Sequence, residues 1–139
     1  MPNPVTDILE TCLYVDDLSA AEAFYTQILG LTIDSKTENR HIFFRCGNRM
    51  LLLFNLEVTS EVHDGPHFAP AHGSTGSGHV AFAIGPEELN HWRHHLTSHN
   101  VEIEKEIQWG ERGHSIYFRD PAGNSLEVTL PAIWGIDQV

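Results

Sequence analysis

Positive charge is scarce in this sequence. Eight Lys and Arg stand against 19 Asp and Glu, so the formal net charge is −11. Binding to nucleic acid or to anionic lipid needs clustered cations that neutralise phosphates, so we expect neither partner. Cysteine is scarce too, because only Cys12 and Cys46 occur, without CxxC or zinc-finger spacing. This usage favours free thiols in a reducing compartment over a disulfide framework.

Long apolar runs are also missing. No stretch approaches the roughly 18 residues that a membrane-spanning helix needs. The opening segment "MPNPVTD" lacks the basic and apolar regions of a signal peptide. We therefore expect a cytoplasmic protein. At 139 residues, of which 41% are hydrophobic, the chain can form one domain with its own core.

The pattern that is present occurs twice. In the first half, "ETCLYV" (10–15) alternates like a strand, and "DDLSAAEAFYTQILGL" repeats apolar residues at helical spacing. Ser19 and Glu22 have the spacing of a capping box, and Gly30 is placed to end the helix. Strand-like runs follow near residues 31–36, 41–46 and 50–56.

The second half repeats this order. "GHVAFAI" (78–84) is strand-like, and "PEELNHWRHHLTSHN" reads as a helix with Pro86 in its first turn. Strand-like runs follow near residues 101–107, 114–119 and 125–130. We therefore predict an α+β fold of two βαβββ modules, 7–56 and 78–131, with mixed sheets curled into a cup. The polar segment 57–77, rich in Gly, Pro, His and Ser, is interpreted as a loop joining the modules.

Alternation along the strands predicts which side chains share a sheet face. One face of each sheet is apolar and should pack on its helix. The other face is predicted to carry Glu10, Cys12, Tyr14, His79, Ser115, Tyr117, Glu127 and Thr129. Small residues beside isolated polar ones indicate the wall of a cavity, although a plain solvated face is the alternative.

The repeat sharpens this interpretation. Glu10 and His79 occupy equivalent places on the first strands, and a gapless alignment of the two halves pairs Leu53 with Glu127 on the last strands. If the halves pack as a pseudo-twofold pair, these four places converge. Glu10, His79 and Glu127 then offer one imidazole and two carboxylates, a set suited to one divalent ion such as Mn, Fe, Zn, Ni or Mg. Three protein ligands leave positions open for water or substrate.

Three segments, "ETCLYVDDLSAAEAFYTQILGL", "GSGHVAFAI" and "SIYFRDPAGNSLEV", resemble signature segments of the vicinal oxygen chelate superfamily, which includes glyoxalase I, bleomycin-resistance proteins, extradiol dioxygenases and fosfomycin-modifying enzymes. The resemblance runs from about residue 7 to 131. It implies paired βαβββ modules that form a cup around a divalent metal, with Glu10, His79 and Glu127 in the ligand positions. Ser115 and Tyr117 fall where fosfomycin thiol transferases contact their substrate.

The resemblance implies a metal-dependent, glyoxalase-like lyase or isomerase that acts on a small oxygen-chelating substrate, in a protein that forms a homodimer. Tyr117 and His72 are the candidates to assist the metal as catalytic groups, and no organic cofactor is implied. The sequence departs from the family where Glu10 replaces a His, and where Leu53 replaces the carboxylate of glyoxalase I. A bleomycin-resistance-like sequestering protein and an extradiol-type dioxygenase are the alternatives.

Overall fold

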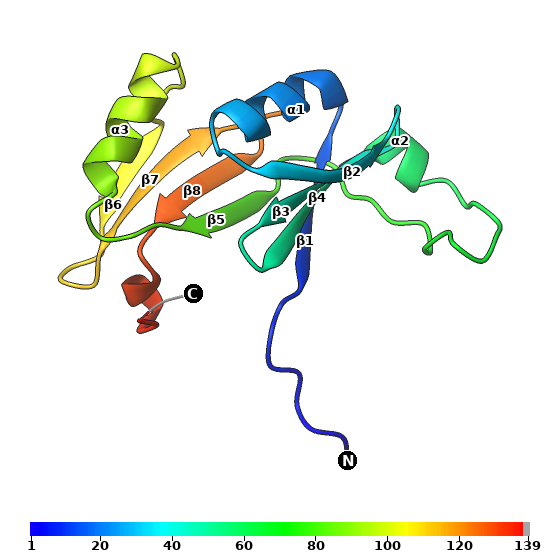
Figure 1. Ribbon diagram of the computed structural model, residues 1–139, viewed down its shortest axis with the longest axis horizontal. Coiled ribbons are helices and arrows are strands. Elements are labelled where there is room, and N and C mark those ends of the chain that lie inside the picture. The colour runs from blue at the N-terminus through cyan, green and yellow to red at the C-terminus, as the bar shows by residue number, and fades with distance from the viewer. Residues whose placement is uncertain (138–139) are drawn as a thin grey trace. The chain divides into compact units, whose positions relative to one another are not determined.

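The computed structural model describes residues 1–137. The chain divides between residues 75 and 76 into two compact units (Figure 1). Each unit has a strand, a helix and three further strands, and each contains a four-stranded mixed sheet that is not closed. This confirms the predicted α+β class and the two βαβββ modules. Within residues 1–137, no helix is long and apolar enough to cross a bilayer.

The first unit, residues 1–75, has its strands in the order β1-β4-β3-β2. Its elements are β1 (Glu10–Val15), α1 (Leu18–Gln27), β2 (Thr32–Thr37), β3 (His41–Cys46), β4 (Arg49–Asn55) and α2 (Leu56–Thr59). The strand β1 runs parallel to β4, and the other pairs are antiparallel. The side chain of Tyr25 on α1 is fully buried beside Phe44 of β3, with ring centroids 5.8 Å apart. The core of this unit therefore lies between α1 and one face of the sheet.

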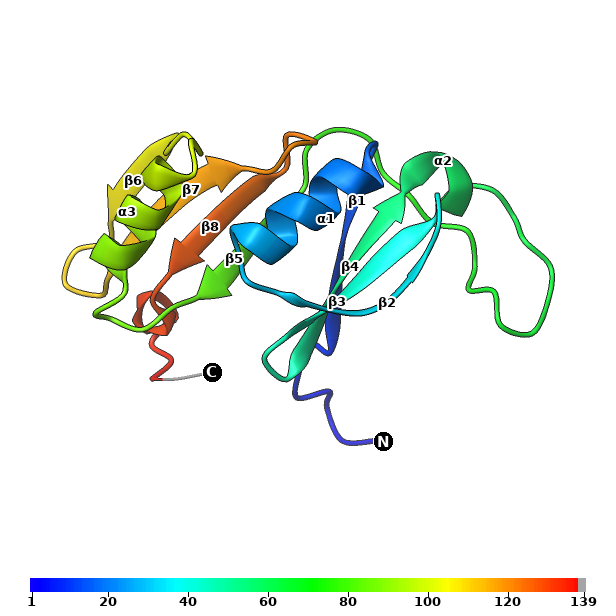
Figure 2. The same ribbon diagram turned by 45° about the horizontal axis from the view of Figure 1, so that its top comes forward.

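The second unit, from residue 76 onward, repeats this arrangement in the order β5-β8-β7-β6. Its elements are β5 (His79–Ala83), α3 (Leu89–Ser98), β6 (Lys105–Gln108), β7 (His114–Arg119), β8 (Ser125–Thr129) and the 3-10 helix η1 (Pro131–Trp134). The helix α3 packs on the face that carries the fully buried Ile116, Phe118 and Val128 (Figure 2). The opposite face of this sheet carries Ser115, Tyr117, Glu127 and Thr129.

The helix boundaries differ from the prediction in two places. Asp17, not Ser19, caps α1, and its carboxylate accepts a hydrogen bond from the backbone N–H of Ala20 at 3.0 Å. The helix α3 begins at Leu89, so the predicted first-turn position of Pro86 is wrong. The later start of α3 has another cause: the backbone N–H of Glu88 donates to the carbonyl of Gly85 at 3.0 Å, so Pro86 lies inside a turn that precedes the helix. Gly30, with φ of +68°, follows α1 as expected.

The strand pairing also corrects the internal alignment. In the first sheet Phe43 pairs with Leu52, and in the second sheet Tyr117 pairs with Glu127. The counterpart of Glu127 is therefore Leu52, and the predicted equivalence with Leu53 is wrong. The side chain of Leu53 is fully buried on the helix-covered face. Measured between these equivalent pairs, the connection from β7 to β8 is one residue longer than the connection from β3 to β4. A gapless alignment of the two halves therefore pairs the residues of β8 with those of β4 one position too far along.

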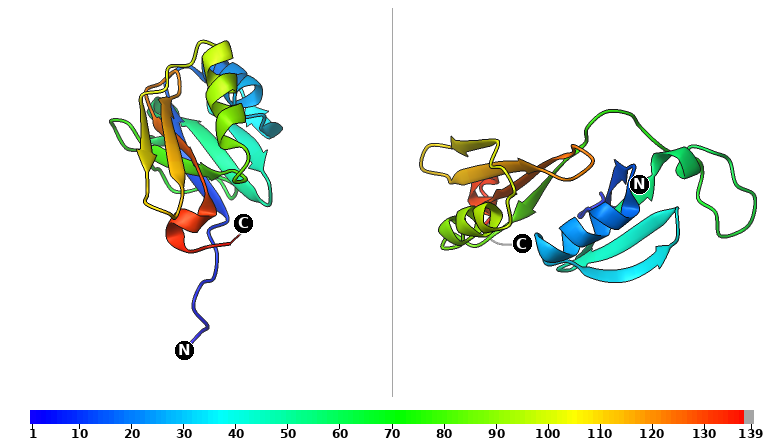
Figure 3. Two further views of the ribbon diagram at one scale, coloured as in Figure 1. Left: turned by 90° about the vertical axis from the view of Figure 1, so that its left-hand side faces the viewer. Right: turned by 90° about the horizontal axis from the view of Figure 1, so that it is seen from above.

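The segment predicted as a plain loop, 57–77, is partly ordered by local contacts. Its first residues belong to α2, and the chain then runs out and back as an extended loop (Figure 3). The backbone N–H of His72 donates to the carbonyl of Thr59 at 2.9 Å, which returns the loop to α2. Gly73 packs so closely on Leu56 that an added Cβ would overlap the Leu56 Cδ1 methyl. These two contacts determine where His72 lies.

Candidate functional site

Two of the predicted metal ligands lie together in the second unit. His79 begins β5, and Glu127 lies in the middle of the neighbouring strand β8. The His79 Nε2 atom is 3.3 Å from the Glu127 Oε1 atom. The imidazole is half exposed, whereas only 7% of the Glu127 side chain is exposed. The pair therefore joins an accessible nitrogen to a nearly buried carboxylate.

The orientation of the His79 ring is held by a backbone contact. Its Nδ1 atom is 3.0 Å from the carbonyl oxygen of Ser125, so the Nδ1–H donates to that carbonyl. In the neutral imidazole this leaves the lone pair on Nε2, the atom that faces Glu127. Metal-ligating histidines commonly use one ring nitrogen in this way and coordinate with the other.

The start of β5 is held by the turn between β7 and β8. Asn124 accepts a hydrogen bond from the backbone N–H of Gly78 through its Oδ1 atom at 2.8 Å, and its Nδ2 group donates to Asp120 at 3.0 Å. Both polar side chains are buried, with 4% and 2% exposure for Asp120 and Asn124. The sequence "DPAGN" forms the turn between β7 and β8, and it also positions the strand end that carries His79.

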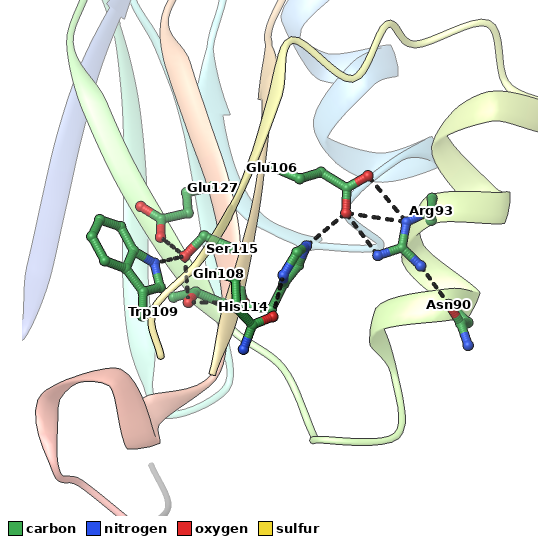
Figure 4. Close-up of polar contacts among 9 residues, drawn as sticks. Asn90, Arg93, Glu106, Gln108, Trp109, His114, Ser115 and Glu127 are labelled. Atoms are coloured by element: carbon green, nitrogen blue, oxygen red, sulfur yellow. Dashed lines mark hydrogen bonds and ion pairs between the residues drawn. The ribbon is translucent and has the colours of Figure 1, made fainter. Parts of the chain in front are cut away.

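The second oxygen of Glu127 is bound from the other side by a hydroxyl group (Figure 4). Ser115 donates its Oγ–H to Glu127 Oε2 at 2.5 Å, and Ser115 Oγ also lies 2.8 Å from Thr129 Oγ1. The indole N–H of Trp109 donates to the same Ser115 Oγ at 2.8 Å. The carboxylate thus has one oxygen facing His79 and the other held by Ser115.

Tyr117 shares this sheet face and pairs with Glu127 across the strands. Its ring lies nearly parallel to the His79 ring, with centroids 6.3 Å apart. Burial raises the pKa of the Tyr117 phenol above 10.0, and the negative charge of Glu127 raises it further. A hydrogen bond to the Glu127 carboxylate also raises this pKa, so the hydroxyl keeps its proton near neutral pH.

His72, the other predicted catalytic group, lies in the first unit. Its Nδ1 atom is 2.6 Å from the hydroxyl oxygen of Tyr14 on β1. The ring of Phe54 meets the His72 ring edge to face, with centroids 4.6 Å apart. Burial raises the pKa of Tyr14, with a smaller contribution from Cys12. A neutral Tyr14 hydroxyl is the natural donor to His72 Nδ1.

Glu10, the third predicted ligand, is the exposed first residue of β1 in the first unit. His79, Glu127 and Tyr117 are thus brought together within the second unit, while Glu10 and His72 belong to the first. Within each unit, the described residues form no group of three His, Cys, Asp or Glu side chains that could hold a metal ion. The three-ligand site made by Glu10, His79 and Glu127 therefore stays a prediction.

Two features were not expected from the sequence. The first is the hydrogen bond between the Trp109 indole N–H and Ser115 Oγ. It depends on the conformation of the turn after β6, which alternation along the strands does not predict. A second polar cluster lies on the helix side of β7, where His114 Nε2 is 2.7 Å from Glu106 Oε1, which also binds Arg93 (Figure 4). His114 therefore points away from Glu127, as its position next to Ser115 on the strand requires.

Known proteins share this arrangement over most of the chain. Residues 7–128 match the Glyoxalase/Bleomycin resistance protein/Dioxygenase superfamily. The chain belongs to this superfamily. The predicted resemblance to the vicinal oxygen chelate proteins is thereby confirmed. Among curated proteins, no match to the chain was found.

Solved structures of the superfamily superpose on the chain to different degrees. A lactoylglutathione lyase from Agrobacterium tumefaciens is 39% identical, with a TM-score of 0.91 over 96% of this chain and 100% of that one. A superfamily protein from Nocardioides is 25% identical, with a TM-score of 0.71 over 93% and 85%. A mutant of the fosfomycin resistance protein FosX from Listeria monocytogenes, complexed with Mn(II) and a dihydroxypropylphosphonic acid, is 21% identical, with a TM-score of 0.67 over 90% of each chain. This last similarity concerns the fold alone.

Proposed function

We propose that this protein is a metal-dependent, glyoxalase-type lyase or isomerase that acts on a small substrate with neighbouring oxygen atoms. The observation that carries the proposal is the contact between His79 Nε2 and the nearly buried Glu127 carboxylate. The lactoylglutathione lyase at 39% identity supports lyase chemistry and suggests lactoylglutathione as the compound to test. Glu10, His79 and Glu127 would hold one divalent ion of the set Mn, Fe, Zn, Ni or Mg.

The charges of the pair fit a bound cation. With Nδ1–H donated to Ser125, the Nε2 atom of His79 faces a carboxylate oxygen 3.3 Å away. A divalent cation could be bound by both atoms, since an imidazole nitrogen and a carboxylate oxygen are both metal ligands. Two ligand atoms roughly 2.1 Å from a shared ion lie on the order of 3.0–3.4 Å apart at ordinary coordination angles, which agrees with the observed separation.

The proposal gives separate roles to the divalent ion, to Tyr117 and to His72. The chemistry that a divalent ion supplies when bound is stabilisation of negative charge on a substrate oxygen. Tyr117 keeps its hydroxyl proton, which is hydrogen-bonded to Glu127, and is proposed to redirect that proton to a bound substrate. His72, fixed by Tyr14 and Phe54, is proposed to move a proton at Nε2, since its Nδ1 atom is already bound. We also propose that the enzyme works as a homodimer in the cytoplasm.

The test combines metal analysis with activity. Untagged wild-type protein, Glu127→Gln, His79→Ala and the exposed control Glu104→Gln are purified in parallel, and their metal content is measured after dialysis against each candidate ion. We expect one bound ion per chain in the wild type and the control, and loss in the two site variants. Formation of lactoylglutathione from glutathione and methylglyoxal should follow metal content. Metal binding unaffected by both site variants would contradict the proposal.

A second candidate function is a sequestering protein for a planar aromatic ligand. It is favoured by rings gathered on the sheet face of the first unit that α1 does not cover. Phe43 stacks on His41 with centroids 4.0 Å apart, and it meets Phe54 edge to face at 5.6 Å. The outcome that supports this candidate is tight binding of an aromatic glycopeptide by protein that binds none of the candidate ions. Calorimetry with the wild type and Phe43→Ala distinguishes the two functions.

A further inference from the structure

The hydroxyl group of Ser115 has no capacity left for a substrate. The side chain is fully buried, and its oxygen lies within hydrogen-bond distance of Trp109, Glu127 and Thr129. A serine hydroxyl has one proton to donate and two lone pairs that accept. Glu127 and Trp109 use the proton and one lone pair, and Thr129 Oγ1 lies 2.8 Å from the same oxygen. The substrate contact that the family resemblance implied for Ser115 is therefore replaced by a contact within the protein.

The hydrogen bonds that link Trp109, Ser115 and Glu127 have directions that the first and last groups determine. An indole N–H can only donate, and an ionised carboxylate can only accept. The proton of Trp109 therefore points to Ser115, and the proton of Ser115 points to Glu127. The Thr129 hydroxyl has two acceptors within reach of its single proton, Ser115 Oγ at 2.8 Å and the carbonyl oxygen of His114 at 3.4 Å. The chain has a single consistent orientation that ends on Glu127 Oε2.

We propose that Trp109 is a positioning residue that acts through Ser115 to orient the Glu127 carboxylate. With Oε2 held by Ser115, the other oxygen is the one directed toward His79 Nε2 at 3.3 Å. The significance of this orientation for metal binding rests on the proposed function. Partners of this kind, bound to a ligand and not to the ion itself, typically contribute 10–100-fold to metal affinity.

The turn that carries Trp109 is built to hold the indole in place. The backbone N–H of Trp109 donates to the carbonyl of Gly113 at 2.8 Å, which closes the turn between β6 and β7. Gly113 has φ of +152°, and an added Cβ would lie only 3.0 Å from Ile133 of η1. Trp109 itself is 41% exposed, so its N–H is bound while much of its ring faces solvent. Replacing this ring by another aromatic one should therefore leave the fold intact.

The experiment is a double-mutant cycle with Trp109→Phe, Ser115→Ala and the double variant, with Trp134→Phe as the matched control. Trp134 is 77% exposed on η1, so its replacement tests the loss of an exposed indole elsewhere. Mn²⁺ and Zn²⁺ affinities are measured by calorimetry on metal-free protein, and the indole N–H resonances are assigned by NMR. Circular dichroism confirms that each variant is folded.

We expect Trp109→Phe to weaken metal binding about tenfold and Ser115→Ala to weaken it between 10- and 100-fold, the range for such partners. The double variant should bind metal no more weakly than Ser115→Ala does, because the effects of residues in one series of hydrogen bonds are not additive. Wild-type affinity in Trp109→Phe, or effects that add in the double variant, would overturn the proposal.

The NMR measurement separates this proposal from the proposed function. Ser115→Ala should shift the Trp109 indole N–H resonance and speed its exchange with solvent, whether or not metal binds. An unchanged resonance would mean that the hydrogen bond is absent. It would refute the positioning role of Trp109 and leave the proposed function untouched. If the resonance moves as expected but the wild type binds no metal, the metal-dependent function fails and so does the effect on metal affinity proposed here, while the hydrogen-bonded chain itself stands.

Discussion

Replacing Glu106 by Gln should destabilise the second unit at neutral pH but not in strong acid. The carboxylate of Glu106 on β6 accepts hydrogen bonds from Arg93 Nη2 at 2.7 Å and lies 2.7 Å from His114 Nε2. These contacts, with the Arg93 hydrogen bonds the largest cause, lower the pKa of Glu106 from its usual 4.5 to about 2. Glu106 therefore connects α3, β6 and β7 through its negative charge.

The size of the effect follows from the pKa. At 1.36 kcal/mol for each pKa unit, the fall would correspond to about 3 kcal/mol of folding free energy. The Glu106 side chain is 29% exposed, so solvent screening reduces the expected value to about 1.5 kcal/mol. Because the folded-state pKa is lowered, this stability is present above pH 4.5 and is lost as the pH falls toward 2.

The assay is urea unfolding followed by circular dichroism at a series of pH values. The free energy of unfolding of Glu106→Gln should lie about 1.5 kcal/mol below the wild type at pH 7, and the two should converge near pH 2. Glu104→Gln is the control, because its ion pair with Arg119 is 46% and 42% exposed and should contribute little. A difference that stays constant from pH 7 to 2, or an equal loss in the control, would refute this reasoning.

Three further predictions concern local structure. Asp17→Ala should lower the free energy of unfolding by about 1 kcal/mol, whereas Ser19→Ala should change it little, which urea titration of both variants checks. Gly73→Ala should cost about 1–3 kcal/mol, because its Cβ must displace Leu56, and an unchanged melting temperature would show that the loop yields freely. Asn124→Ala should lower the free energy of unfolding by about 2–4 kcal/mol, because the backbone N–H of Gly78 and the buried carboxylate of Asp120 each lose a hydrogen bond. Thermal unfolding measures this change.

Local periodicity was sufficient to predict the order of the elements. The strand predicted at 10–15 is observed as Glu10–Val15, because alternating side chains match a half-covered sheet. The run predicted near 101–107 overlaps a shorter strand, Lys105–Gln108, because the regular pairing with β7 covers only these residues, although the alternation begins at Val101. The one-residue error in the internal alignment has a different origin. Turn length is not visible in a hydrophobic pattern, and β4 is apolar on both faces, so Leu52 and Leu53 could not be told apart.

The candidate site could be predicted only in part. Parity along β5 and β8 correctly assigned His79 and Glu127 to one face, because neighbouring parallel strands keep the same alternation. Trp109 is linked to Glu127 through Ser115. This link depends on the conformation of a glycine-containing turn, which sequence spacing does not determine. The position of His72 depends on the close approach of Gly73 to Leu56, a contact between residues far apart in the loop.

The connection "DPAGN" has a consequence for anyone who redesigns this protein. A shorter hairpin in its place would still join β7 to β8, and both strands would keep their ladder. The amide oxygen of Asn124 would be gone, however, and with it the anchor for the backbone of Gly78 just ahead of His79. Trimming that surface connection would loosen a histidine on a different strand, so the hairpin must be retained whole in any graft of this site onto another scaffold.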